Sequence, residues 1–133
     1  MIIVNCDGGS RGNPGKAAIG TIIRNENKIV EKYKEKIGIE TNNVAEYKSL
    51  IKSLELAKKH EDELMIYMDS ELVINQMNGK YKVQAENLLP LYSKAKELEK
   101  DFKKIEYKHV LRGDKFQAMA DELVNEALDG KKI

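Results

Sequence analysis

Three short runs with many apolar residues open the chain, the third of them partly alternating with charged residues, and they predict three β-strands. Residues 1–6 and 17–25 are rich in Ile and Val, whereas residues 28–39 alternate apolar side chains with Lys and Glu. Turns that contain Gly or Asn separate the three runs. Three consecutive short strands of this kind predict an antiparallel meander.

The period then changes to that of a helix, which we expect over residues 41–60. Either Thr41 or Asn42 can cap its first turn, and His60 lies where a basic side chain complements the negative end of the helix dipole. The apolar side chains share one helical arc, made of Tyr47, Leu50, Ile51, Leu54 and Ala57. This arc predicts a helix with one face against the sheet.

Residues 64–68 form a nearly continuous apolar run, as expected for a strand that is covered on both faces. The following residues, 69–79, predict a short helix that is capped by Asp69 or Ser70 and ends near Gly79. This succession of strand and helix predicts a βα unit.

The last part of the chain predicts a strand with one helix before it and one helix after it. Apolar residues recur at helical spacing over 88–102, with Asn87 as the candidate cap. Residues 103–111 alternate apolar and charged side chains, which predicts a strand with one buried face. Residues 116–128 predict a final helix that ends at Gly130. The resulting order, βββαβααβα, is typical of an α/β fold with a mixed sheet flanked by helices.

Composition limits the class, the compartment and the partners. The chain has 133 residues, of which 41% are hydrophobic and 34% charged, so we expect a single globular domain over residues 1–133. The net charge of +1 means that a nucleic acid would have to bind a local patch. The single cysteine, Cys6, and the lack of a signal segment or a membrane-spanning apolar run are typical of a cytoplasmic protein without a membrane partner.

Four acidic residues fall at junctions or edges of the predicted elements, namely Asp7, Glu46, Asp69 and Asp121. Each has an ordinary structural explanation. Asp7 can belong to a turn that ends the first strand, and Asp69 can cap a helix. Glu46 and Asp121 border the apolar arcs of their helices, where a carboxylate can be solvated. Taken singly, none of the four identifies a site.

A parallel pairing of the first and fourth strands would bring Asp7 and Asp69 to neighbouring strand ends, with Glu46 and Asp121 on flanking helices. Clustered carboxylates repel one another unless protons or cations neutralise them. Oxygen ligands favour Mg²⁺ or Mn²⁺, whereas Zn²⁺ would favour Cys and His, which are few and scattered here. Two such ions about 4 Å apart can activate a water and stabilise the leaving oxygen of a phosphodiester. The four acids therefore predict metal-assisted phosphodiester hydrolysis.

The chain contains four motifs in the order in which they occur in type 1 ribonuclease H: DGGSRGNPG, TNNVAEY, MDSELVINQMNGKYKV and ADELVNEAL. It resembles that family over essentially its whole length. The resemblance implies an RNase H-like fold with a five-stranded mixed sheet, in which two parallel strands are added to three antiparallel ones. The chain lacks the basic insertion of the long-form bacterial members, so it is most similar to the compact archaeal and bacterial branch.

The resemblance also implies an activity. It implies an endoribonuclease that uses two Mg²⁺ or Mn²⁺ ions to hydrolyse the RNA strand of RNA/DNA hybrids, leaving 5′-phosphate and 3′-hydroxyl ends, and we expect this chain to act as a monomer. In the family pattern Asp7, Glu46, Asp69 and Asp121 take the metal-ligand positions. Asp7 matches the acid that bridges both ions, so its loss should be the least tolerated.

Substrate contacts are implied as well. The glycine-rich segment after Asp7 matches family positions along the minor groove of the hybrid, where small residues permit close backbone approach. Asn13, Asn42 and Asn43 are the expected readers of RNA 2′-hydroxyl groups, which distinguish RNA from DNA without reading bases. The candidate substrate-binding residues are Gly8, Ser10, Arg11, Asn13, Thr41, Asn42, Asn43, Lys80, Lys82 and Arg112.

The loop before the last acid departs from the long-form pattern. Many bacterial members carry a His there that assists proton transfer or product release, but this loop contains none. His109 precedes the loop on a predicted strand, where we expect a half-buried structural residue. Arg112 or Lys115 could reach the scissile phosphate instead. Beside the third acid, Glu71 replaces a Gln that often contacts the substrate in long-form members.

Other functions stay open at this point. An RNase H-like module that binds hybrid or structured RNA without cutting it would fit the missing loop His. Resolvases and integrases share the fold and cut DNA, although the NNVAEY helix and the Asn-bearing glycine segment favour the ribonuclease branch. Double-stranded RNA is a further open substrate. The GNPGK segment does not fit a nucleotide-binding P-loop, because Ser10 and Ala17 replace residues that this motif needs.

Overall fold

Strands and helices follow one another in the predicted order in the computed structural model, which describes residues 1–130. The elements are β1 (Ile2–Gly12), β2 (Gly15–Asn25), β3 (Lys28–Glu40), α1 (Asn42–Ala57), β4 (Glu63–Met68), α2 (Glu71–Met77), α3 (Leu89–Glu99), β5 (Lys104–His109) and α4 (Lys115–Leu128). The spacing of apolar and polar residues therefore predicted correctly which of these elements are strands and which are helices.

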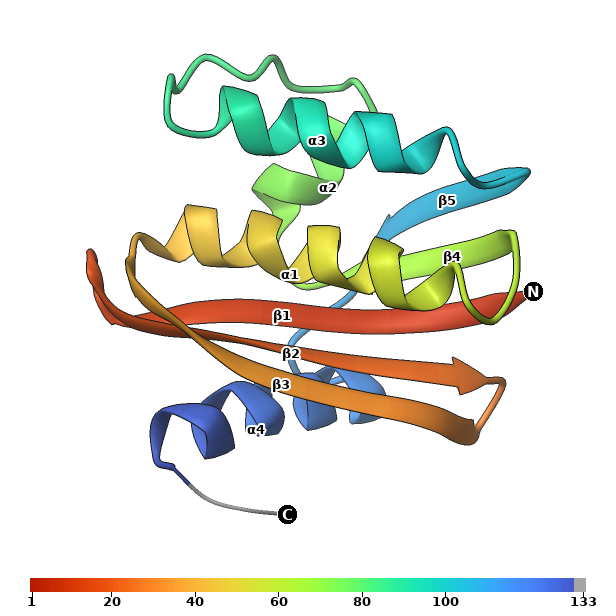
Figure 1. The fold of residues 1–133 in the computed structure, drawn as a ribbon, viewed down its shortest axis with the longest axis horizontal. Coiled ribbons are helices and arrows are strands. Elements are labelled where there is room, and N and C mark those ends of the chain that lie inside the picture. Colours follow the sequence, from red (N-terminus) through yellow and green to blue (C-terminus); the bar gives the residue numbers. More distant parts are fainter. Residues whose placement is uncertain (131–133) are drawn as a thin grey trace.

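The strands form one sheet in the order β3-β2-β1-β4-β5. β1, β2 and β3 pair antiparallel as a meander. β4 runs parallel to β1, and β5 runs parallel to β4. The expected mixed five-stranded sheet is thus confirmed, with β1 at its centre (Figure 1).

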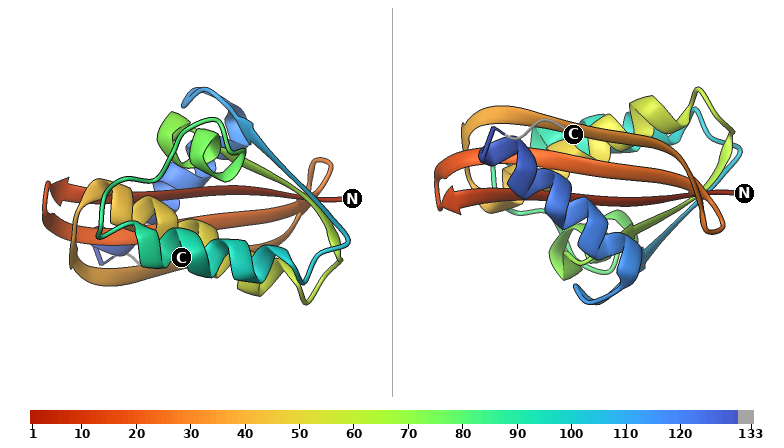
Figure 2. Two further views of the ribbon diagram at one scale, coloured as in Figure 1. Left: turned by 90° about the horizontal axis from the view of Figure 1, so that it is seen from above. Right: turned by 90° about the horizontal axis from the view of Figure 1, so that it is seen from below.

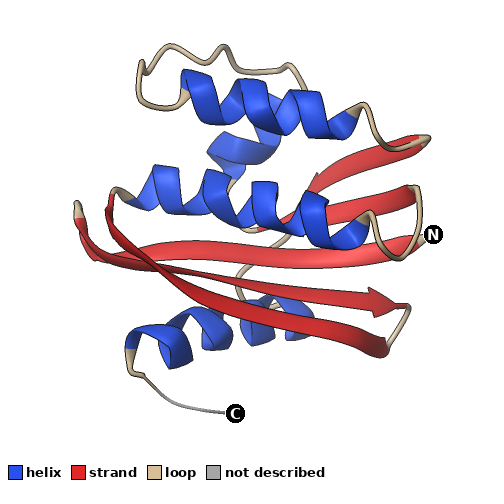
Figure 3. Ribbon diagram, viewed as in Figure 1, coloured by secondary structure: helices blue, strands red, loops and turns tan. Residues whose placement is uncertain are grey.

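Helices cover both faces of the sheet (Figures 1 and 3). α1 packs on β1 and β2, α3 packs against α1, and α4 crosses the opposite face over β2 and β1. The larger apolar core lies between the sheet and the first three helices, and two smaller clusters lie under α4. The two views in Figure 2 show these faces in turn, with α3 in front in one and α4 in front in the other. Among the described residues, no helix has both the length and the apolar character needed to cross a bilayer.

Side-chain caps start three of the helices. Thr41 caps α1, Ser70 caps α2 and Asp114 caps α4, each by accepting a hydrogen bond from a backbone N–H of the first turn. Because Ser70 takes the cap of α2, the neighbouring Asp69 carboxylate does not serve as the cap of that helix.

The glycine-rich segment is part of β1 and not a loop that ends it. β1 continues beyond Asp7 and pairs with β2 as far as Gly12, which lies opposite Gly15. The predicted strand end at Asp7 is wrong because β2 supplies ladder partners along the whole segment. Gly8 makes room for a helix: a Cβ at this position would lie 2.1 Å from the carbonyl oxygen of Ala45 in α1.

The change Gly8→Ala is therefore expected to lower the free energy of unfolding by about 3 kcal/mol, because α1 would have to move away from β1. Thermal or urea unfolding measures the loss. Gly113→Ala is the matched control, since no heavy atom lies within 4 Å of the position that its Cβ would take. Equal stability of the two variants would contradict the tight contact at Gly8.

Three smaller expectations are also corrected. Every second residue of β4 is only partly buried, because α4 covers β1 and β2 and leaves the second face of β4 less covered. Asn87 does not cap α3, which starts after Leu88 without a side-chain cap. α1 ends at Ala57, so His60 lies beyond the helix, where its Nε2 is 2.8 Å from Oε1 of Glu31.

Candidate active site

The pairing of β1 with β4 brings two of the acids together. The last paired residues are Asn5 and Tyr67, so Asp7 and Asp69, each two positions further along, come side by side where β4 ends. Asp7 lies buried inside β1, and Asp69 directly follows β4 and is partly buried. The expected juxtaposition across parallel strands is present, although Asp7 is not at the end of its own strand.

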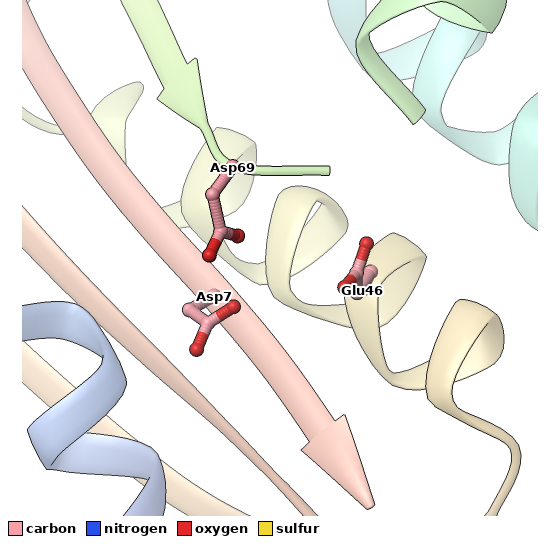
Figure 4. Close-up of side chains that lie close together, drawn as sticks. All are labelled: Asp7, Glu46 and Asp69. Atoms are coloured by element: carbon pink, nitrogen blue, oxygen red, sulfur yellow. The ribbon is translucent and has the colours of Figure 1, made fainter. Parts of the chain in front are cut away.

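Glu46 reaches the same place from α1. Its side chain is buried, and Nδ2 of Asn42, one turn earlier, donates to Glu46 Oε1 at 3.3 Å. Carboxylate oxygens of Asp7, Glu46 and Asp69 all lie within 4.8 Å of one another. Figure 4 shows the three side chains gathered where β1, α1 and the end of β4 meet. The close approach of α1 at Gly8 is what allows Glu46 to join the two aspartates.

Asp121 approaches Asp7 from α4, on the other face of the sheet. It is partly buried, and both its charge and a hydrogen bond act on the Asp7 carboxyl group. Asp7, Glu46 and Asp121 line one cleft of about 170 Å³. The structure thus brings the four predicted acids to one place, three as a tight cluster and Asp121 beside Asp7.

Burial and crowding shift the pKa values of this cluster. Burial is the largest cause that raises the pKa of Asp7 to about 9, and the charges of Asp69, Glu46 and Asp121 add to it. Burial also raises the pKa of Glu46 to about 7, although hydrogen bonds, from Ser70 above all, oppose the shift. Both shifts mean that burial and the neighbouring acids disfavour the charged forms of these two carboxyl groups. Such a site gains much from a cation.

Arg112 brings a positive charge to the rim. Its Nε lies 3.5 Å from Asp69 Oδ2, and its side chain is 78% exposed. The charges of Asp121 and Asp69 raise the pKa of this guanidinium. Lys115, the other cation considered in this loop, lies instead over the ring of Phe116. An exposed guanidinium beside the acids can meet an incoming phosphate.

Several predicted substrate-binding residues form a hydrogen-bonded rim between the β1–β2 turn and α1. Asn42 Oδ1 accepts the backbone N–H of Ser10 at 3.3 Å, and the backbone N–H of Asn42 donates to Asn13 Oδ1 at 3.1 Å. Thr41 is occupied as the helix cap, and Asn43 is exposed in the first turn of α1. The three linked residues lie next to Glu46, because Asn42 also bonds to that acid.

The remaining predicted contacts differ in position. Arg11 borders the acid cleft, but its Nη1 is paired with Asp129 Oδ1 at 2.6 Å. Gly8 also borders the cleft, but the space left by its missing side chain is filled by α1 and not left for a ligand. Lys80 and Lys82 lie on the exposed loop after α2, in a different groove. The two lysines are therefore apart from the acids, whereas Arg11 and Gly8 border them.

The donor set fits divalent cations that prefer oxygen. Four carboxylates supply hard oxygen ligands and an excess of negative charge. Among the described residues, neither histidine belongs to the cluster, and His109 is half-buried on β5 as expected. Burial raises the pKa of the Cys6 thiol to about 12, so this thiol is not a ready metal ligand. These side chains therefore fit a hard divalent cation with oxygen ligands better than Zn²⁺.

Some residues at the site were not expected from the sequence. Ser70 donates a hydrogen bond to Glu46, and Asn125 lines the acid cleft. Asn125 stands one helical turn after Asp121, and that spacing is the signal that could have indicated it. Three further polar residues are buried on β1, β2 and the first turn of α4, namely Asn5, Arg24 and Gln117. The sequence feature that could have indicated them is a polar residue inside or beside an apolar run.

Comparison with known proteins gives consistent matches. A family model described as Reverse transcriptase-like matches residues 5–127. The chain is 41% identical over 131 residues to the bifunctional protein Rv2228c of Mycobacterium tuberculosis, covering 96% of this chain and 35% of that protein. It is 39% identical over 125 residues to ribonuclease HI of Halobacterium salinarum, covering 92% of this chain and 62% of that protein. The chain thus spans less than two thirds of the length of these curated relatives.

Solved structures match at a similar level. RNase H1 from the halophilic archaeon Halobacterium salinarum has a TM-score of 0.92 at 37% identity, covering 97% of this chain and 98% of that one. LC11-RNase H1, isolated from compost and solved in complex with an RNA/DNA hybrid, has a TM-score of 0.91 at 39% identity, covering 98% of each chain. The likeness therefore extends over nearly the whole chain.

Proposed function

This chain belongs to the type 1 ribonuclease H family and has its RNase H-like fold, and we propose that it is a metal-dependent endoribonuclease that hydrolyses the RNA strand of RNA/DNA hybrids. The observation that carries the proposal is the cluster of Asp7, Glu46 and Asp69, whose carboxylate oxygens lie within 4.8 Å, with Asp121 beside it. LC11-RNase H1, which has the same fold, is known in complex with such a hybrid. The proposed products carry 5′-phosphate and 3′-hydroxyl ends.

In this proposal Asp7, Glu46, Asp69 and Asp121 are the residues that would hold two Mg²⁺ or Mn²⁺ ions. When bound, the ions supply an activated water and stabilise the leaving oxygen. The protein's own part is to hold the carboxylate oxygens in place. The β1–β4 pairing holds Asp7 and Asp69, and the Asn42 amide holds Glu46.

The rim residues are suited to recognise RNA. Asn13 Oδ1 is already used by the N–H of Asn42, so the exposed NH₂ group of Asn13 is the part that can reach a 2′-hydroxyl. Ser10 and Asn42 hold this rim together beside Glu46. Contacts to 2′-hydroxyl groups carry no base identity, so we expect little sequence preference. Lys80 and Lys82, on their separate groove, would meet phosphates further along the duplex.

Arg112 takes the place of the histidine that many bacterial members have in this loop. Arg112→Ala is expected to lower kcat about tenfold at saturating hybrid, because the guanidinium beside Asp69 no longer meets the phosphate charge. Arg112 also lowers the pKa of Glu46, so the rate of the variant should reach its plateau at higher pH. Steady-state rates from about pH 6 to about pH 9 measure both effects.

Lys115→Ala is the control for this variant, because Lys115 belongs to the same exposed stretch but lies over Phe116 and not at the acids. If both variants kept the wild-type kcat and pH profile, Arg112 would be an exposed loop charge without a part in the reaction.

A panel of duplexes tests the proposed function. We expect the pure protein with Mn²⁺ to cut a labelled RNA strand annealed to DNA and to leave an all-DNA duplex intact. Cutting of the same RNA annealed to RNA would add double-stranded RNA as a substrate. Binding of the hybrid without cutting would identify a non-catalytic module, and cutting of the DNA duplex would point to the resolvase class. We further propose that residues 1–133 act as one domain, as a monomer in the cytoplasm.

A further inference from the structure

Three polar side chains are buried together between β1, β2 and the start of α4. Asn5 is 0% exposed, Gln117 is 1% exposed and Arg24 is 8% exposed. Buried polar groups cost free energy unless they find partners. An apolar residue would avoid this cost, so the presence of all three polar residues together needs a reason.

The three side chains form one connected network. Gln117 Nε2 donates to the backbone carbonyl of Cys6 at 2.8 Å, and Gln117 Oε1 accepts from Asn5 Nδ2 at 3.2 Å. Asn5 Oδ1 in turn accepts from Arg24 Nε at 3.0 Å. The Arg24 guanidinium lies 4.0 Å from the ring centre of Phe116, the residue before Gln117. The network therefore ties the first turn of α4 to the backbone of β1.

These hydrogen bonds between α4 and β1 lie close in the chain to two of the acids. Cys6 directly precedes Asp7, and Asp121 follows Gln117 by one helical turn, on the same side of α4. Gln117 thus joins the strand that carries one acid to the helix that carries another. Its two hydrogen bonds lie beside Asp7 and one turn before Asp121.

In the first half of α4 the other contacts with the sheet do not provide this direction. Ala120, Leu123 and Val124 make apolar contacts with Ile22 and Ala18, and contacts of this kind are non-directional. The polar contacts of α4 with the strands lie further along the helix, where Arg11 donates to Asn125 and Lys34 pairs with Glu126. Gly20 lets α4 lie close to β2, since a Cβ there would be 2.5 Å from the Ala120 carbonyl oxygen. This contact sets the distance between α4 and the sheet. Hydrogen bonds are needed to fix the position of the helix along its own axis.

We propose that Gln117 is a positioning residue that sets the separation between the Asp7 and Asp121 carboxylates, and through it the cation affinity of the site. The inference rests on the proposed cation-dependent function. Asn5 and Arg24 complete the hydrogen-bond network and hold the Gln117 amide in one orientation. Asp69 and Glu46 do not depend on it, because strand pairing and α1 hold them.

The first test replaces Gln117 with Met, which keeps the volume and loses both hydrogen bonds. The control is Thr21→Val, which removes the buried hydrogen bond between Thr21 and Ser53 on the α1 face, 2.9 Å long. The readouts are the Mn²⁺ concentration at half of the maximal rise in melting temperature, kcat, and KM for the hybrid. We expect Gln117→Met to raise the Mn²⁺ midpoint about fivefold and to lower kcat about tenfold, with KM within about twofold of wild type.

Thr21→Val is expected to lower the metal-free melting temperature without moving the Mn²⁺ midpoint. Gln117→Asn, which keeps the amide but shortens its reach, gives the same test if the Met variant does not fold. In an Asp121→Asn background, replacing Gln117 should no longer move the Mn²⁺ midpoint, because the two residues act as one unit.

An unchanged midpoint in both Gln117 variants would overturn the proposal, as would an equal shift with and without Asp121. A wild-type protein that binds Mn²⁺ but does not cut the hybrid would refute the proposed function, while the midpoints would still decide the role of Gln117. A wild-type protein without any response to Mn²⁺ would overturn both.

Discussion

Replacing Asp7 with Asn is expected to slow cleavage of the hybrid by at least about 1,000-fold while making the cation-free protein more stable. The loss of rate follows from the position of Asp7 between Asp69 and Glu46 on one side and Asp121 on the other. An amide keeps the size of the side chain but removes the charge that would bridge two cations. The fold should persist, because the backbone pairing of Asp7 with Gly20 does not involve the carboxylate.

The gain in stability has a defined pH dependence. The pKa of Asp7 rises from 3.8 to about 9 on folding, with burial as the main cause. Between these values the folded state keeps a proton that the unfolded state has released, so the unfolding free energy of the wild type falls as pH rises. Asn has no proton to lose. The advantage of the variant should therefore be absent near pH 4, grow with pH, and reach on the order of 2 kcal/mol near pH 7.

Urea unfolding in EDTA from about pH 4 to about pH 9 measures this difference. Glu106→Gln is the control, because it removes an exposed carboxylate on β5, away from the cluster. A variant of Asp7 that is less stable than wild type at neutral pH, or a gain that does not depend on pH, would contradict the picture of an acid held among like charges.

Removing divalent cations is expected to abolish cleavage and to lower the melting temperature. The crowded carboxylates destabilise the folded protein, and a cation that binds the folded state relieves their repulsion. A ligand at a hundred times its Kd stabilises the folded state by about 2.7 kcal/mol, which corresponds to several degrees for a domain of this size. The rise should be largest at high pH, where the protons that otherwise neutralise Asp7 and Glu46 are lost.

Thermal unfolding with increasing Mn²⁺ or Mg²⁺, and again after EDTA, measures the effect. The Asp7→Asn variant serves as the control, because its response to the cation should be much smaller. Cleavage that continues in EDTA would contradict the need for a cation. An equal rise of melting temperature in both proteins would contradict the binding of the cation by these acids.

Periodicity predicted most of the fold because the helices and strands have clear local patterns. The apolar arc of α1 and its Thr41 cap are examples, as is Gly130 after α4. The glycine-rich part of β1 failed because local turn signals compete with pairing to β2, and that pairing depends on residues elsewhere in the chain. Gly8 illustrates the same limit, since its close neighbour Ala45 lies in α1, and the residues around Gly8 do not indicate that this helix packs against them.

The gathering of the four acids could be predicted because each occupies a distinct place in the local pattern and in a family motif. The contacts around them were not, because they join distant parts of the chain. Asn5 meets Gln117 although 112 positions separate them, and no local pattern indicates such a pair. The separation of Lys80 and Lys82 from the acids likewise follows from where α2 ends in space.

The most direct test of the account is cleavage of a labelled RNA strand in an RNA/DNA hybrid by the wild type and by Asp69→Asn, each with Mn²⁺ and with EDTA. Asp69→Asn leaves the cap of α2 to Ser70, so the variant should fold normally. The account predicts cleavage by the wild type with Mn²⁺ alone, and neither in EDTA nor by the variant. A wild-type protein that leaves the hybrid intact, or a variant that cuts it at the wild-type rate, would contradict the account.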